Sequence, residues 1–275
     1  MMKEGLMSHL FVFGLGYSAG RLARRLAGEG WAVEGTGRAG KIRFEDEAAV
    51  RAGLERATHI LSSVPPGAEG DPVLDRYRAA ITAAPAGWIG YLSSTGVYGD
   101  TGGAWVDETA PVGGGRRSAR VIADAAWRAL GRPVHVFRLP GIYGPGRSVL
   151  ERIREGRARR IALPGQVFSR VHVDDIAGGV IAGMRGPAGV YNLADDLPCP
   201  QNDVITYGCA RLGLPVPPLQ TLAEAGLSPA AAAFYAENRR VANGRAKRLL
   251  GWRLRYPDYR AGLGAMASEC QGAPV

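Results

Sequence analysis

A glycine-rich turn between a short apolar run and a helical pattern constrains this chain more than any other feature. Residues 10–13 read LFVF, and residues 14–19 read GLGYSA. From Ala19 onward, apolar residues recur at i, i+3, i+4, i+7 and i+8, which predicts an amphipathic helix. Gly28 is suited to end that helix. A second strand-like run at residues 31–36 completes a strand–turn–helix–strand unit.

The turn follows the pattern G-x-G-x-x-A, in which each small residue has a physical purpose. Gly14 suits a tight turn out of the strand, Gly16 lets backbone N–H groups approach a pyrophosphate, and Ala19 permits close packing of helix on strand. The helix N-terminus would then face the anion. Together with Tyr17 and Ser18, these residues predict a dinucleotide-binding site. A plain glycine-rich turn is the alternative.

The end of the second strand bears on which dinucleotide would bind. An acid about 20 residues after the turn suits the ribose 2′-hydroxyl of NAD, whereas an arginine suits the 2′-phosphate of NADP. Here Gly37 is followed by Arg38, with Lys41 close behind, and Glu34 lies inside the strand rather than at its tip. The sequence therefore favours NADP(H), unless Arg38 is only a solvated surface charge.

Composition indicates an ordinary globular enzyme. Hydrophobic residues make up 46% of the 275 residues and charged residues 21%, and no run approaches the ~18 apolar residues of a membrane span. We expect neither a signal peptide nor a membrane association. The three cysteines have no metal-like spacing, so we expect free thiols, no metal site and a cytoplasmic location.

The net charge of +9 has an unusual origin. Three of the 34 basic residues are lysines, so the other 31 are arginines. They are scattered through the predicted helices, and the densest segment, residues 152–160, has no interleaved aromatic residues. Charge alone leaves nucleic-acid binding open, but we do not expect it.

Strand-like and helical segments alternate through the first half of the chain. This alternation predicts an α/β fold with a doubly wound parallel sheet, whose ligands sit at the carboxyl ends of the strands. The expected strands after residue 36 are 58–64, 88–92, 134–138 and 190–195; the expected helices are 45–56, 71–84 and 116–130. For the helix at 71–84, Asp71 followed by Pro72 predicts an N-cap and a first-turn proline.

Beyond residue 147 the pattern loosens and becomes mostly helical. We therefore expect a cofactor-binding domain over residues 1–147, to which residues 171–195 return, and a smaller substrate-binding lobe over residues 148–275.

Several motifs in a fixed order make the chain resemble the extended short-chain dehydrogenase/reductase superfamily, in its epimerase/dehydratase-like branch. This resemblance implies a Rossmann-type cofactor domain and a small C-terminal substrate lobe. It also implies that two strand ends lie along the cofactor, namely Ser62-Ser63-Val64 and Leu139-Pro140. The motifs are the turn at 14–19, SSTGVYG at 93–99, RLPGIYGPGR at 138–147, HVDD at 172–175 and YN at 191–192.

The superfamily's Tyr-x-x-x-Lys dyad is missing, because none of the three lysines follows a tyrosine by four residues. Ser94 aligns with the family's serine, while Arg116 and Arg120 occupy the places of the tyrosine and the lysine. Arginine stays protonated, so Arg116 cannot act as an ordinary general acid. Arg120 can still hold ribose hydroxyls, or the two arginines can clamp an anion; a solvated helix face is the alternative for both.

This departure makes the chain look like the atypical branch of the superfamily. Tyr98 and Tyr143 are the nearest substitute proton donors, although tyrosines at such Tyr-Gly positions usually pack in the core. Phe168 stands where nucleotide-sugar enzymes carry a phosphate-binding arginine, so a typical nucleotide sugar is not expected. Asp174 and Asp175 are better explained as first-turn residues of a helix than as paired catalytic carboxylates.

We therefore expect an NADP(H)-dependent oxidoreductase of the epimerase/dehydratase-like type, acting on a small carbonyl or imine compound near Ser94. The alternative is a non-catalytic NADP(H)-binding sensor or partner protein. In the superfamily, dimers form through the helices expected here at 71–84 and 116–130. Both contain several alanines, so a homodimer is also expected.

Overall fold

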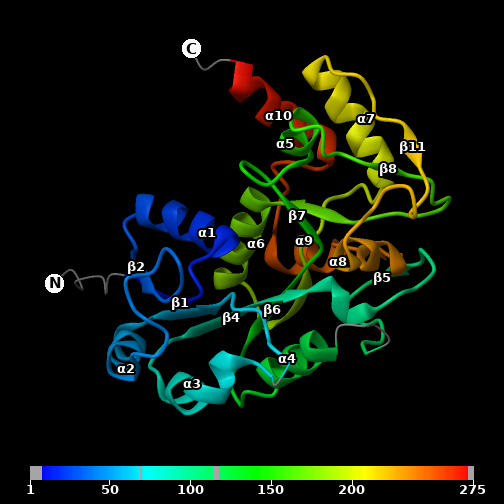
Figure 1. The fold of residues 1–275 in the computed structure, drawn as a ribbon. Helices are drawn as coiled ribbons and strands as arrows, with labels where there is room; N and C mark the ends of the chain where they lie inside the picture. The colour runs from blue at the N-terminus through cyan, green and yellow to red at the C-terminus, as the bar shows by residue number, and fades with distance from the viewer. Residues whose placement is uncertain (1–7, 69, 114–117, 272–275) are drawn as a thin grey trace.

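A six-stranded, fully parallel sheet forms the centre of the computed structural model, which describes residues 8–68, 70–113 and 118–271 (Figure 1). The predicted doubly wound α/β fold is confirmed. In spatial order the strands are β10 (Gly189–Asn192), β6 (His135–Leu139), β4 (Trp88–Ser94), β3 (His59–Ser62), β1 (His9–Phe13) and β2 (Ala32–Gly35).

Ten α-helices are assigned within the described residues. They are α1 (Tyr17–Gly28), α2 (Glu47–Arg56), α3 (Pro72–Ala83), α4 (Ser118–Arg128), α5 (Val149–Arg154), α6 (Val173–Arg185), α7 (Gln201–Leu212), α8 (Pro229–Ala232), α9 (Gly244–Leu250) and α10 (Tyr259–Gln271). The 3-10 helices are η1 (Thr95–Tyr98) and η2 (Ala233–Ala236). The short strand pairs are β5 (Trp105–Val106) with β12 (Arg240–Val241), β7 (Gly141–Tyr143) with β9 (Arg170–His172), and β8 (Arg160–Ile161) with β11 (Leu219–Gln220).

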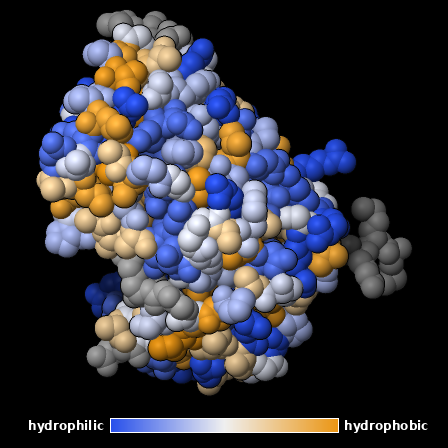
Figure 2. All heavy atoms as spheres, turned by 90° about the vertical axis from the view of Figure 1, so that its right-hand side faces the viewer, coloured by the Kyte–Doolittle hydropathy of each residue, from blue (hydrophilic) through white to orange (hydrophobic). Residues whose placement is uncertain are grey.

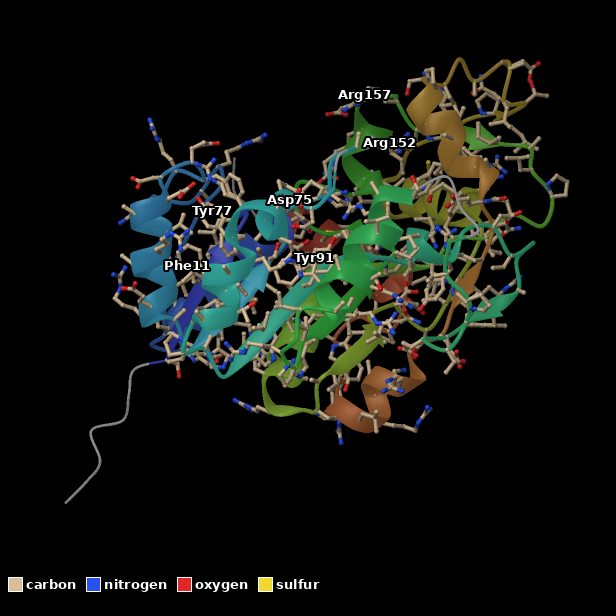
Figure 3. The ribbon with its side chains drawn as sticks, turned by 90° about the horizontal axis from the view of Figure 1, so that it is seen from below. Phe11, Asp75, Tyr77, Tyr91, Arg152 and Arg157 are labelled. Carbon is tan, nitrogen blue, oxygen red and sulfur yellow. The ribbon has the colours of Figure 1, made fainter. Side chains whose placement is uncertain are left out.

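Successive side chains of a strand point to opposite faces of the sheet. Both faces of this sheet are largely apolar, so helices cover both of them. In β1, Leu10 and Val12 pack with α1, α6 and α9, whereas Phe11 and Phe13 pack with α2, α3 and α4. Figure 1 shows α1 and α6 above the sheet and α2, α3 and α4 below it. Figure 3 views the lower layer and shows Phe11 and Tyr77 within it.

The start of α3 fixes two helices of the lower layer. Asp71 caps α3 by accepting hydrogen bonds from the N–H groups of Val73 and Leu74, both at 3.0 Å. Its other oxygen accepts a 2.8 Å hydrogen bond from the Trp127 indole of α4. The predicted cap at Asp71, with Pro72 in the first turn, is confirmed.

The C-terminal lobe has its own small core, formed where α5, α7 and α10 pack together. Figure 2 shows the face that carries this lobe, with apolar residues in patches among hydrophilic ones. Residues 214–222 contribute four exposed apolar side chains: Leu214, Val216, Leu219 and Leu222. Within the described ranges, no helix combines the length and the apolar character needed to cross a bilayer.

Candidate functional site

The glycine turn joins β1 to α1. Its two glycines, Gly14 and Gly16, differ in whether the surrounding packing leaves room for a Cβ. Gly14 has a φ of +86°, and a Cβ on it would lie 3.0 Å from Val64 Cγ2 and 3.3 Å from the Val64 nitrogen. The protein itself therefore requires glycine at position 14. A Cβ on Gly16 would meet only the Gly14 oxygen, at 3.9 Å. The packing leaves room for a Cβ at position 16. Because glycine has no Cβ, the space in front of the helix N-terminus stays open.

Helix α1 begins without a side-chain cap. Gly16 is the N-cap residue, and its own N–H donates to the Gly14 oxygen at 2.7 Å. The N–H groups of the first helical turn have no intrahelical acceptor and carry the positive end of the helix dipole. This arrangement suits an anion at the mouth of the turn. Ala19, buried in the core, places the helix against the sheet.

The end of β2 packs directly against the same turn. Thr36 accepts from the Gly14 N–H through its hydroxyl, at 3.2 Å, and from the Leu15 N–H through its carbonyl, at 2.7 Å. Gly37 follows with a φ of +101°, and a Cβ there would lie 2.7 Å from the Leu15 nitrogen. Arg38 comes next and is exposed. Sequence patterns did not indicate Thr36, because its role depends on pairing β2 beside β1.

A cleft of about 510 Å³ opens at the carboxyl ends of β1, β3, β4 and β6. It contains eight of the residues predicted from sequence as cofactor-binding or catalytic: Gly16, Tyr17, Ser18, Ser63, Ser94, Arg120, Leu139 and Pro140. Gly14, Ala19, Ser62 and Val64 lie behind this lining, and Arg38 lies outside it. Arg116 falls outside the described residues.

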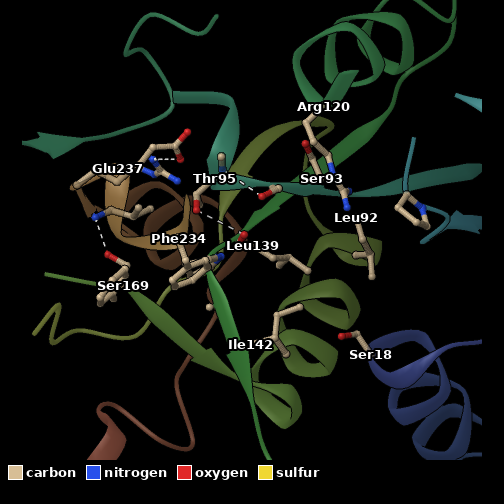
Figure 4. A pocket seen from close by; sticks show the side chains of 18 of the residues that line it. Ser18, Leu92, Ser93, Thr95, Arg120, Leu139, Ile142, Ser169, Phe234 and Glu237 are labelled. Carbon is tan, nitrogen blue, oxygen red and sulfur yellow. Dashed lines mark hydrogen bonds and ion pairs between the residues drawn. The ribbon is translucent and has the colours of Figure 1, made fainter. Parts of the chain in front are cut away.

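Three consecutive hydroxyl residues end β4 at the cleft (Figure 4). Ser94 caps η1, since its oxygen accepts a 3.1 Å hydrogen bond from the Gly96 N–H. Thr95 is buried, and its hydroxyl lies 3.5 Å from the Leu139 carbonyl oxygen. Ser93 is also buried and donates to Asp124 at 2.7 Å. Ser94 is the least buried of the three and has the hydroxyl best placed to contact a ligand.

The opposite wall of the cleft comes from segments that sequence reasoning did not single out as a site. Phe168 stacks on Phe234 with ring centroids 5.1 Å apart. Glu237 and Arg239 form an ion pair at 2.9 Å, and Arg239 also donates to the Gly99 carbonyl. Ser169, Phe234 and Glu237 are labelled around the cleft in Figure 4. Apart from Phe168, which precedes the HVDD motif, no local motif marks these residues, since only the fold brings them to the turn.

No protein-family model matches the chain. A 3-diazoavenalumate denitrifying reductase from a Streptomyces species is 32% identical over 144 residues, which are 47% of this chain and 45% of that protein. Protein YeeZ of Escherichia coli (strain K12) is 29% identical over 176 residues, which are 61% of this chain and 58% of that protein. The chain thus matches about half the length of these curated relatives.

Solved structures match over nearly the whole chain. A functionally unknown conserved protein from Silicibacter pomeroyi DSS is 45% identical, with a TM-score of 0.86 over 96% of this chain and 99% of that one. A protein described as an NAD-dependent epimerase/dehydratase from Methylobacillus flagellatus is 25% identical, with a TM-score of 0.72 over the same shares. The human epimerase family protein SDR39U1, solved with NADPH, is 20% identical, with a TM-score of 0.79 over 94% and 99%.

These fold neighbours include NAD-dependent epimerase/dehydratase-like and SDR39U1 proteins, which agrees with the resemblance of the motifs to the extended, atypical short-chain dehydrogenase/reductase superfamily.

The two tyrosines that the sequence suggests as proton donors do not line the cleft. The Tyr98 hydroxyl donates to Asn192 at 2.7 Å and accepts from Arg138 at 3.0 Å. The Tyr143 hydroxyl donates to the Asp258 carbonyl oxygen at 3.3 Å. Burial raises the pKa of both tyrosines, the opposite of what the family's lysine does for its tyrosine. Both hydroxyls are thus bound to other parts of the chain in the ligand-free protein.

A buried network behind the cleft explains the position of Tyr98. Arg138 forms two hydrogen bonds with Asp124, at 3.0 and 2.8 Å, and its guanidinium lies 4.9 Å from the Tyr98 ring centroid. Both charged side chains are 1–2% exposed. Burial alone would lower the pKa of Arg138, but the contacts with Asp124 and Tyr98 together outweigh burial, so the pKa is raised. The network holds the end of β4 against α4 and β6.

Arg120, which the resemblance aligns with the family's lysine, lines the cleft from α4 (Figure 4). Its half-buried side chain comes from the helix beside Ser93 and Ser94. A guanidinium at this place can donate to ribose hydroxyls or to an anionic group without changing its charge.

The two carboxylates of the HVDD motif bind other parts of the chain and do not line the cleft. Asp174 binds Arg21 of α1 through two hydrogen bonds, and Asp175 accepts from the backbone N–H groups of Arg255 and Tyr256, at 2.6 and 3.1 Å. Both lie in the first turn of α6. Burial raises the pKa of Asp175 to about 6, and burial lowers the pKa of His172 to about 4.

Asp195 follows β10 and is almost completely buried. One carboxylate oxygen accepts from the Leu197 N–H at 3.3 Å. Burial raises its pKa to about 7, although the charge of Arg170 acts in the opposite direction. Among the described residues, no three His, Cys, Asp or Glu side chains gather as metal ligands would.

Proposed function

We propose that this protein binds a nicotinamide dinucleotide in the cleft and uses it to reduce a small carbonyl or imine compound. The observation that carries the proposal is Gly16. The protein has room for a side chain at this position, yet a side chain would stand between an uncapped helix N-terminus and the cleft. A glycine that packing does not require is best explained by a ligand that approaches the backbone closely.

The cleft residues fit such a ligand in a definite order. The N–H groups at the start of α1 would hold the pyrophosphate, with Ser18 beside them. Ser63, Leu139 and Pro140 would lie along the nicotinamide half, where Arg120 can donate to the ribose hydroxyls. The bound dinucleotide supplies a hydride. Ser94 would donate a hydrogen bond to the oxygen or nitrogen of the substrate and so polarise it. The proton that this atom gains after hydride transfer would come from water, since the Tyr98 and Tyr143 hydroxyls are bound elsewhere.

Arg38 favours NADP(H) over NAD(H). It follows the strand end at which NAD enzymes carry an acid. The side chain is exposed, and within the described residues it has no ion-pair partner. It is therefore available for a 2′-phosphate. The human fold neighbour was solved with NADPH, which agrees with this preference.

The substrate side of the cleft supports a small, partly apolar compound. Phe168 and Phe234 form an aromatic wall, and Phe168 takes the place of the arginine that binds phosphate in nucleotide-sugar enzymes. One curated relative is itself named as a reductase. A reductase of compact carbonyl or imine substrates fits this wall better than a nucleotide-sugar epimerase does.

The competing function is a non-catalytic NADP(H)-binding sensor or partner protein. It is favoured by the positions of Tyr98 and Tyr143, whose hydroxyls are bound elsewhere. A protein that only senses the cofactor would need the glycine turn and Arg38 but not Ser94.

Calorimetric titration with NADPH and NADH tests the cofactor site. Gly16→Val should abolish binding of both cofactors, while Gly28→Val at the other end of α1 is the matched control, since a Cβ there meets nothing within 4 Å. Arg38→Ala should weaken NADPH only, by about tenfold, and Arg120→Ala should weaken both. If wild type binds neither cofactor, the proposal is wrong.

A screen for NADPH oxidation with small carbonyl and imine compounds then separates reductase from sensor. With an active substrate, Ser94→Ala should lower kcat by about 100-fold and leave NADPH affinity unchanged. Tight NADPH binding without turnover of any compound would favour the sensor.

A further inference from the structure

A second hollow lies along the other end of α1, away from the cleft. It has a volume of about 960 Å³ and runs between α1, α6 and the segment at residues 250–255. Figure 1 shows α1 and α6 side by side above the sheet. We call it the arginine groove, because its lining includes six arginines against two aspartates. The arginines are Arg21, Arg24, Arg25, Arg185, Arg253 and Arg255.

The two aspartates of the arginine groove are already occupied. Asp174 is bound by Arg21, and Asp175 accepts two backbone N–H groups. In the described part of the chain, Arg24, Arg185 and Arg253 form no ion pair. All three are exposed and come from three different segments. Their convergence on one hollow leaves a strong positive charge without an internal partner.

Apolar side chains form part of the floor of the arginine groove. They include half-buried Ile181, Leu250 and Leu254. A Cβ on Gly178 would lie 3.8 Å from both the Arg25 guanidinium and the Trp252 indole nitrogen, so both reach the floor. The Trp252 indole is only 3% exposed and donates to the Asp175 carbonyl oxygen at 3.1 Å. No aromatic face is therefore available among the lining residues for stacking a nucleic-acid base.

We propose that the arginine groove is a second ligand site, which binds a small anion carrying two or more phosphate groups. Planar guanidinium groups bind phosphate oxygens through paired hydrogen bonds, and three unpaired arginines match several negative charges. The volume is in the range of small-molecule sites. The apolar part of the floor accommodates a less polar part of the ligand. This site is independent of the dinucleotide proposed for the cleft.

Inorganic triphosphate is a suitable probe for calorimetric titration at low ionic strength, with the cleft saturated by NADPH if the protein binds it. The triple variant Arg24→Ala, Arg185→Ala, Arg253→Ala should bind triphosphate about tenfold or more weakly than wild type. The matched control is Arg51→Ala, Arg78→Ala, Arg128→Ala, which removes the same charge from exposed positions on α2, α3 and α4. It should bind like wild type.

Three results would overturn the proposal. Equal losses in the two triple variants would show that net charge, not the groove, attracts the anion. Displacement of triphosphate by NADPH, with no effect of the groove variant, would assign the binding to the cleft. Tighter binding of a polyglutamate peptide or an RNA oligonucleotide than of triphosphate, lost in the groove variant, would make the partner a macromolecule. Thermal unfolding of both variants checks that each is folded.

Discussion

Two arginine–aspartate pairs of the same chemistry lie in very different surroundings. Arg138 and Asp124 sit behind the cleft with 1–2% of their side chains exposed, and Ser93 and Tyr98 complete their hydrogen bonding. Arg21 and Asp174 join α1 to α6 at the arginine groove, with 40% and 14% exposed. Both pairs form two hydrogen bonds, so geometry alone does not distinguish them.

The difference shows that burial, rather than the pair itself, decides what an ion pair does. A buried charge that loses its partner has no water to replace it, so the buried pair makes the fold depend on both members. A partly exposed pair is screened by solvent, and Arg21, which is 40% exposed, can be hydrated alone. The buried pair therefore supports the wall that carries Ser94, while the exposed pair mainly orients side chains at the groove.

The largest expected effect comes from breaking the buried pair. Arg138→Met leaves Asp124 charged and buried, so we expect the free energy of unfolding to fall by about 3–5 kcal/mol. Denaturant unfolding measures this. The double variant Asp124→Leu, Arg138→Met should recover part of the loss, because no charge is then left unpaired. A loss below about 1 kcal/mol in the single variant would contradict the comparison.

Asp195 is a buried carboxyl that has no ion-pair partner among the described residues, and it can be compared with the paired Asp124. The pKa of Asp195 rises from 3.8 to about 7 on folding, so the folded state holds this proton over a pH range in which the unfolded state has released it. The contribution of Asp195 to stability therefore falls as the pH rises from 3.8 to about 7 and is constant above that.

Asp195→Asn removes this titration while keeping an acceptor for the Leu197 N–H. Relative to wild type, the variant should gain about 2 kcal/mol more stability at pH 8 than at pH 5. Unfolding curves at the two pH values measure the difference. A gain that does not change with pH would mean that Asp195 keeps an ordinary pKa.

The smallest effect is expected for the exposed pair. Arg21→Ala should lower the free energy of unfolding by only about 0.2–1 kcal/mol, and less at high salt. A double-mutant cycle with Asp174→Ala isolates the coupling between the two side chains. If the coupling free energy of Arg21 with Asp174 were as large as that of Arg138 with Asp124, burial would not decide the strength of these ion pairs.

The sequence was sufficient to predict those features that depend on local pattern. The glycine turn, the alternating strands and helices and the cap at Asp71 each depend on residues within a few positions of one another, and the structure places them as expected. The order of motifs also indicated the fold that the epimerase/dehydratase-like structures share with this chain. Such features can be predicted because backbone geometry ties particular residue types to particular local conformations.

Features that depend on long-range packing could not be predicted. Phe234 and Glu237 reach the cleft from more than 200 residues beyond the turn, and no periodicity marks them. The sequence suggests Tyr98 and Tyr143 as the nearest substitutes for the missing tyrosine of the dyad. Their hydroxyls point instead to Asn192 and to the Asp258 carbonyl, which only the folded chain brings near.

The uncapped start of α1 has a consequence for amide hydrogen exchange. Backbone N–H groups in the first turn of a helix have no internal acceptor, so the amides of Tyr17, Ser18 and Ala19 should exchange rapidly with deuterium in the ligand-free protein. Buried amides of β1, one turn away, should exchange slowly. Any anion seated on the turn would slow the first group and leave the second unchanged, and would thus report occupancy at single-residue resolution without requiring turnover.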